Sequence, residues 1–105
     1  MIGLMLLGQS CSGGDTKFLQ VINSPDTFHR RELEISGIYH ERFEDVAIYL
    51  NRDNDKEKAI WLDIDDSHEE FDGKRIRLKG KFIATDKGHL GEYIGTMRDA
   101  KILED

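Results

Sequence analysis

Apolar and charged residues alternate most clearly between residues 75 and 82. The apolar side chains of Ile76, Leu78 and Phe82 take one parity, and the basic side chains of Arg75, Arg77, Lys79 and Lys81 take the other. A period of two predicts a half-buried antiparallel strand. Gly80 stands where a core side chain is expected, which predicts a bulge or a sharp bend.

Four other stretches follow a similar pattern. We predict strands over residues 32–40, 43–50, 59–64 and 95–103. In the last of these the alternation slips between Met97 and Ala100, which predicts a bulge near Arg98.

Strand parity assigns side chains to the two faces of the predicted sheet. Inward positions are predicted for Leu33, Ile35, Val46, Ile48, Leu50, Ile60, Leu62 and Ile64. Outward positions are predicted for Glu32, Glu34, Ala47, Tyr49 and Trp61. A tryptophan on the outside of a sheet indicates either cover by a loop or the N-terminal segment, or a platform for a ligand.

The segments between the strands are less regular. Residues 16–23 fit a short helix or a first strand, and a helix would place Phe18, Leu19 and Ile22 on one face. Pro25 ends this segment, because the residue before a proline is disfavoured in helix. Phe28 is predicted to plug one end of the core. Residues 65–72 form an acidic connector that has room for one helical turn, and we expect it to remain solvated.

Five strands, with Gly37 and Gly80 inside two of them, predict an all-β fold with small helical content. Our first choice is a five-stranded OB-fold-like Greek-key barrel with a short N-terminal helix or strand, and an SH3-like barrel or open meander is the alternative. The 105 residues fit one domain over residues 16–105, preceded by a separate segment, residues 1–15. In an OB barrel the first and fourth strands pair. Glu32 and Glu34 are therefore expected to lie beside Arg75, Arg77 and Lys79 and to neutralise this basic row.

The first fifteen residues are similar to an export signal. Residues 2–7 are apolar, small residues follow, and Cys11 precedes a polar tether, residues 12–15. The apolar run is too short to span a bilayer. A cysteine at this junction resembles a bacterial lipoprotein, although Gly8 and Gln9 depart from the usual motif and no basic residue precedes the run. We expect an exported protein, periplasmic or membrane-anchored, with Cys11 as the lipid attachment site; the alternative is an incidental cysteine.

Charge and residue spacing argue against nucleic-acid binding and against two common metal motifs. The formal net charge is −6, and an acidic chain is a poor general partner for nucleic acid, because phosphate affinity comes from Lys and Arg. The zinc motif H-E-x-x-H fails after His40, because Glu44 replaces the second histidine. A calcium loop beginning at Asn51, with Asp53 and Asp55 as its next acidic positions, lacks its glycine, since Lys56 takes that position. We predict no metal and no cofactor.

Several short motifs together resemble one family. They are Phe43-Glu44, Ile48-Tyr49-Leu50, Ala59-Ile60-Trp61-Leu62, Asp72-Gly73-Lys74, and Lys87-Gly88-His89-Leu90-Gly91 followed by Gly95. Over residues 19–103 the chain is similar to small, exported, uncharacterised bacterial proteins with an OB-like barrel. The resemblance implies a fold and a compartment, and it supplies no activity.

The loop from Thr85 to Gly95 is the predicted functional site, because OB barrels bind ligands with the loop between the fourth and fifth strands. We predict that His89, Glu44, Tyr93 and Trp61 contact the ligand. His89 titrates near neutrality when unperturbed. The alternative is structural: His89 bonds a backbone carbonyl or Glu44 and only fixes the loop.

Three classes of function remain open. We favour a monomeric, non-enzymatic envelope module that binds an unidentified protein or small molecule and touches the membrane only through an N-terminal lipid. One alternative is an OB domain for oligosaccharide or single-stranded nucleic acid, which would stack bases on Trp61 and Tyr49. The other is a small hydrolase-type enzyme using His89 and Glu44, although no nucleophile or metal motif supports it.

Overall fold

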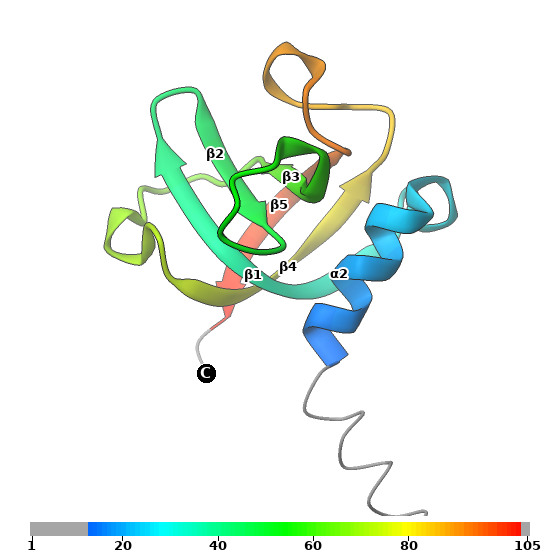
Figure 1. Cartoon of the computed structure of the whole chain (residues 1–105), viewed down its shortest axis with the longest axis horizontal. Helices are drawn as coiled ribbons and strands as arrows, with labels where there is room; N and C mark the ends of the chain where they lie inside the picture. Colours follow the sequence, from blue (N-terminus) through cyan, green and yellow to red (C-terminus); the bar gives the residue numbers. More distant parts are fainter. Residues whose placement is uncertain (1–12, 104–105) are drawn as a thin grey trace, which may run out of the picture.

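The computed structural model describes residues 13–103, with side chains from Thr16 onward, as a mostly β fold with one short N-terminal helix. The strands are β1 (Glu32–Arg42), β2 (Asp45–Tyr49), β3 (Ala59–Leu62), β4 (Arg75–Ile83) and β5 (Thr96–Leu103). They form one mixed sheet that closes in a ring, in the order β1-β2-β3-β5-β4 (Figure 1). Every pair is antiparallel except β3 with β5.

The predicted strands are confirmed with shifted ends. Phe43 and Glu44 form a tight turn instead of opening β2, and Glu44 has a left-handed φ of 59°. β3 ends at Leu62, two residues before its predicted end at Ile64. β1 and β4 pair as predicted, so Glu34 lies opposite Lys79.

The segment predicted as either a short helix or a first strand is the helix α2 (Gly13–Asn23). Phe18 and Val21 are buried in the main core, and Ile22 packs against it. The prediction that Leu19 shares this face is wrong, because its side chain is 48% exposed. The spacing of three between Phe18 and Val21 turns the buried face away from Leu19.

The 3₁₀ helix η1 (Pro25–Phe28) follows α2 and inserts Phe28 into the same core. This confirms the predicted burial of Phe28. A second 3₁₀ turn, η3 (Glu69–Phe71), supplies the single helical turn expected in the acidic connector. In residues 13–103 no helix has the length and apolar character needed to cross a membrane. Cys11 and the signal-like segment up to residue 12 lie outside the described residues.

Apolar clusters lie on both faces of the curved sheet. The main cluster fills the inside of the ring, and the second, outer cluster consists of Ile38, Ala47, Tyr49, Ala59 and Tyr93, with Trp61 packed against it. Ala47 and Tyr49 therefore have the predicted outward parity and are nevertheless buried. Tyr93, from the segment between β4 and β5, packs on this face and removes it from water.

The irregularity predicted at Gly80 in β4 and the bulge predicted near Arg98 in β5 are one and the same bulge. Lys79 pairs with Lys101 while Lys81 pairs with Arg98, so Gly80 faces two residues of β5. A Cβ atom at Gly80 would lie 2.6 Å from Cγ of Met97, which only glycine avoids. The bulge therefore reflects the close approach of the two strands at this point.

Candidate functional site

Two loops meet at one end of the ring, at the top of Figure 1. One is the β1–β2 turn at Phe43 and Glu44, and the other is the segment 84–95 with the 3₁₀ turn η4 (His89–Gly91). Nε2 of His89 lies 3.4 Å from Oε2 of Glu44. This places His89 beside its predicted partner.

Trp61 lies beneath the same loop and is half-buried. The His89 ring stacks on it at a centroid distance of 6.0 Å, and the Tyr93 ring meets it edge-on at 5.3 Å. Gly88 has a φ of 71°, and a Cβ atom there would lie 2.5 Å from Cβ of Trp61. The four predicted site residues are thus brought together, and the loop partly covers Trp61.

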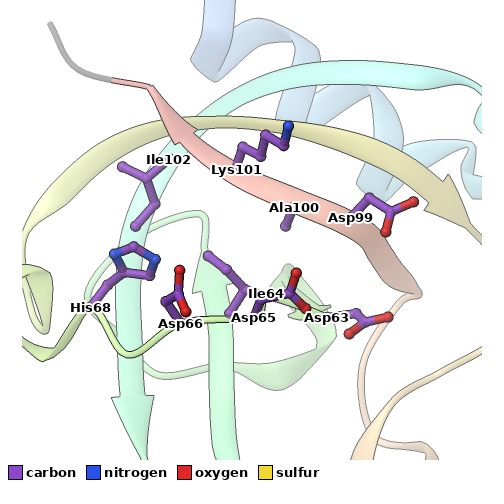
Figure 2. A pocket seen from close by; sticks show the side chains of 9 residues that line it. All are labelled: Asp63, Ile64, Asp65, Asp66, His68, Asp99, Ala100, Lys101 and Ile102. Carbon is purple, nitrogen blue, oxygen red and sulfur yellow. The ribbon is translucent and has the colours of Figure 1, made fainter.

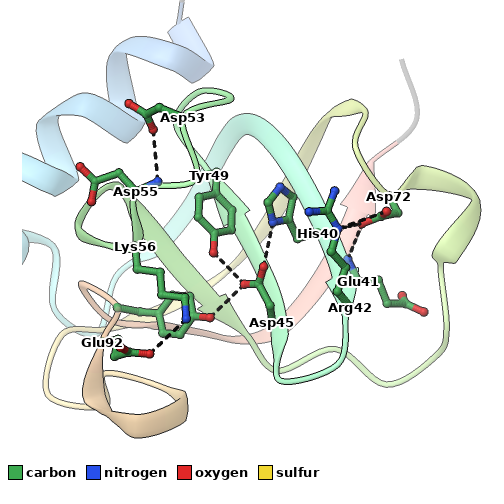
Figure 3. Close-up of polar contacts among 11 residues, drawn as sticks. His40, Glu41, Arg42, Asp45, Tyr49, Asp53, Asp55, Lys56, Asp72 and Glu92 are labelled. Carbon is green, nitrogen blue, oxygen red and sulfur yellow. Dashed lines mark hydrogen bonds and ion pairs between the residues drawn. The ribbon is translucent and has the colours of Figure 1, made fainter.

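A half-buried carboxylate, Asp45, ties the two loops together (Figure 3). Oδ1 of Asp45 accepts hydrogen bonds from the hydroxyls of Tyr49 at 2.8 Å and Tyr93 at 2.9 Å. Oδ2 lies 2.8 Å from Nδ1 of His40, which is 3% exposed. Since an ionised carboxylate only accepts hydrogen bonds, Nδ1 of His40 is the donor. We call this cluster of His40, Asp45, Tyr49 and Tyr93 the Asp45 hub.

The pKa shifts in the Asp45 hub keep the protons on the two tyrosine hydroxyls and do not favour proton transfer. Burial by itself would raise the pKa of Asp45, but hydrogen bonds from His40, Tyr49 and Tyr93 outweigh it and hold the pKa below its ordinary value. Burial, followed by the hydrogen bond to Asp45, raises the pKa of both tyrosines above the usual value. The hydroxyls therefore stay protonated as donors, and the hub holds the β4–β5 segment against the β1–β2 hairpin.

Asp45 and His40 are not among the site residues predicted from the sequence. The signal was available in the hairpin register, because His40 pairs with Ala47 and Ile38 pairs with Tyr49. A two-residue turn at positions 43 and 44 sets this register and puts His40, Asp45 and Tyr49 on one face. The predicted strand 43–50 includes the turn, and a turn placed inside a strand leaves the hairpin register undefined.

Two apolar side chains flank the Glu44–His89 pair and point into solvent. Phe43 is 91% exposed and Leu90 is 77% exposed, more than any other large apolar side chain that the structure describes. Leu90 also has a left-handed backbone with φ 58° and ψ 13°, which is costly for a residue with a branched side chain. Backbone strain of this kind concentrates at functional sites.

Tyr49 does not offer the stacking platform that the nucleic-acid alternative requires. Its side chain is 2% exposed, and its ring lies 4.1 Å from the His40 ring. Trp61 is partly covered by His89 and Tyr93. The outer face of β2 and β3 is therefore occupied by the protein's own side chains.

The acidic connector lines a pocket of about 600 Å³ beside β5 (Figure 2). Its wall includes Asp63, Asp65, Asp66 and Asp99, and Ile64 and Ile102 supply apolar surface. Among the described residues no group of three or more His, Cys, Asp or Glu side chains has an arrangement suited to a metal ion. The carboxylates therefore form an acidic surface and not a cluster with metal geometry.

Comparison with known proteins adds no assignment to this site. No family model matches the chain, and no curated protein or solved structure matches it. The resemblance to exported bacterial proteins therefore stays a prediction.

Proposed function

We propose that the chain is an OB-fold-like, non-enzymatic binding module of the bacterial cell envelope and that it binds a protein partner. The ring order β1-β2-β3-β5-β4 and the single parallel pair support the OB assignment. The envelope location rests on the signal-like segment, residues 1–15, and on the family resemblance.

The exposure of Phe43 and Leu90 carries the proposal. Both residues lie on loops that OB folds use for ligands, namely those between strands one and two and strands four and five. Protein interfaces concentrate affinity in a few large apolar or aromatic anchors surrounded by a polar rim. Glu44, His89 and Glu92 supply such a rim around these two anchors.

The contacts beneath the two anchors support a preorganised surface. The β1–β2 turn and the β4–β5 segment are joined by the Asp45–Tyr93 hydrogen bond and by the Glu44–His89 pair. A third loop contacts the β4–β5 segment through Lys56, whose Nζ lies 3.1 Å from Oε1 of Glu92. Loops that are already ordered lose less conformational entropy on binding, which favours affinity.

An enzymatic role for His89 and Glu44 has less support. The side chains are 31% and 54% exposed, so water competes for both groups. The hydroxyls of Tyr49 and Tyr93 are held in their protonated form by the Asp45 hub. The arrangement suits a surface ion pair better than a protected acid–base pair.

Leu90→Gly is expected to separate binding from stability. Glycine adopts a φ of 58° without the penalty that leucine has, so the free energy of unfolding should stay level or rise by up to about 1 kcal/mol. Loss of the apolar anchor should weaken partner binding about 30-fold, corresponding to a hot spot of roughly 2 kcal/mol. Thermal melts and quantitative pull-down from envelope extract measure the two effects.

Leu19→Ser serves as the matched control, because Leu19 is also an exposed leucine but lies on α2, away from both loops. It should leave the amount of captured partner unchanged. Equal capture by the parent and Leu90→Gly, or equal loss in both variants, would contradict the proposed site.

A further inference from the structure

The outer face of β4 and β5 carries two pairs of like charges. Lys79 lies directly opposite Lys101, and Lys81 lies directly opposite Arg98. All four residues are exposed. Like charges facing each other across strands destabilise a sheet. This arrangement therefore favours an anionic partner that lies over both pairs, and we call these four residues the basic face.

The acidic residues of β1 neutralise only part of this surface. Oε2 of Glu34 lies 3.3 Å from Nη1 of Arg77, as expected from the pairing of β1 with β4. Within residues 13–103, however, no member of the basic face forms an ion pair with a carboxylate. Glu34 lies directly opposite Lys79 on β1, so the predicted charge pairing extends along β4, and Glu32 lies opposite Lys81 in the same way. On β5, Lys101 and Arg98 have only Lys79 and Lys81 opposite them.

The acidic pocket borders the basic face at β5, because Asp99 and Lys101 both line it. Figure 2 shows the Lys101 side chain on the opposite side of the β5 ribbon from Asp65 and Asp66. Charges further away than about 8 Å are largely screened at physiological salt. Asp65 and Asp66 therefore do not lie on the side of β5 from which an anionic surface would contact Lys101.

We propose that the basic face binds the anionic headgroups of a phospholipid bilayer. Clusters of four or more Lys and Arg near a membrane are typical of contact with anionic lipid. The outward side chains of β4 and β5 include no aromatic residue, whereas single-stranded nucleic acid is bound by stacking on aromatic rings. The basic face lies on the strands β4 and β5, whereas Phe43 and Leu90 lie on loops, so different residues would contact the bilayer and the partner.

Co-sedimentation of the full chain with vesicles tests this inference. One set contains equal parts of phosphatidylglycerol and phosphatidylcholine, and the other contains phosphatidylcholine alone, which reports any binding through the apolar residues 2–7. The parent should prefer the anionic vesicles, and added salt should weaken the preference. Lys79→Gln combined with Lys101→Gln should weaken binding to anionic vesicles about 25-fold, because each charge contributes about fivefold.

Lys58→Gln combined with Lys87→Gln is the control, since it removes the same charge outside β4 and β5. This variant should bind anionic vesicles like the parent. Equal binding to both vesicle sets, or equal loss in the two double variants, would overturn the inference. Binding of single-stranded oligothymidine at physiological salt, without a preference for anionic vesicles, would also overturn it and assign the face to nucleic acid.

Discussion

Asp45→Ala is expected to lower the free energy of unfolding by about 3 kcal/mol, because a mostly buried carboxylate is removed from three donors. His40, Tyr49 and Tyr93 would each lose their acceptor in a site that water hardly reaches. The β4–β5 segment would also lose its hydrogen bond to the hairpin. Urea denaturation followed by circular dichroism measures the change.

Asp72→Ala is the control for this variant. The Asp72 carboxylate accepts hydrogen bonds from the backbone N–H of Glu41 and the side chain of Arg42, but it lies nearer the surface, and its side chain is 32% exposed. Its loss should cost only about 1 kcal/mol. Equal destabilisation by the two variants would mean that the Asp45 hub has no special structural role.

Asp45→Asn should flatten the acid dependence of stability. The pKa of Asp45 is lower in the folded than in the unfolded chain, so its stabilising contribution is complete above about pH 4 and is lost as pH falls through the folded pKa. Asparagine does not titrate, and the variant should lose less stability than the parent between about pH 5 and pH 3. Glu41 and Asp72 also have lowered pKa values, so part of the slope should remain. An unchanged slope in denaturation at several pH values would contradict the assigned role of Asp45.

Gly88→Ala is expected to destabilise the protein by about 3 kcal/mol and to expose Trp61. Its φ of 71° and ψ of −156° lie in a region that is nearly closed to other residues. The new Cβ atom would also overlap with Cβ of Trp61, so the loop must move away. Quenching of Trp61 fluorescence by iodide should therefore be weak in the parent and much stronger in the variant.

Gly91→Ala separates the effect of backbone strain from the effect of overlap with Trp61. Gly91 also has a left-handed φ, 67°, but a Cβ atom there would meet nothing within 4 Å. This variant should lose only about 1 kcal/mol and keep Trp61 protected. Strong quenching in the parent, or in Gly91→Ala, would show that the loop does not cover Trp61 in solution.

The strands were predictable because their physical signal is local. Alternation in residues 75–82 reflects burial on one face. Gly80 indicated the bulge, because β5 approaches so closely there that no side chain fits. The helix face was predicted incorrectly at Leu19, since several rotations of a short helix bury similar apolar area. The burial of Tyr49 could not follow from parity alone, because it depends on a segment more than forty residues later.

The candidate site was predicted in part for the same reason. The glycines around His89 and the chemistry of Glu44 and Trp61 are visible in the sequence, and the structure brings these residues together. The Asp45 hub depends on hairpin register and on Tyr93 arriving from a distant loop. The exposure of Phe43 and Leu90 is likewise a property of the folded chain, because apolar residues in a sequence are expected to be buried.

Photo-crosslinking in the native host tests the central claim most directly. A photoreactive phenylalanine analogue would be placed separately at Phe43, at Leu90 and, as the exposed control, at Leu19. The proposed function predicts the same protein adduct from positions 43 and 90 and none from position 19. The absence of an adduct at both loop positions, or the same adduct in equal yield from position 19, would contradict it.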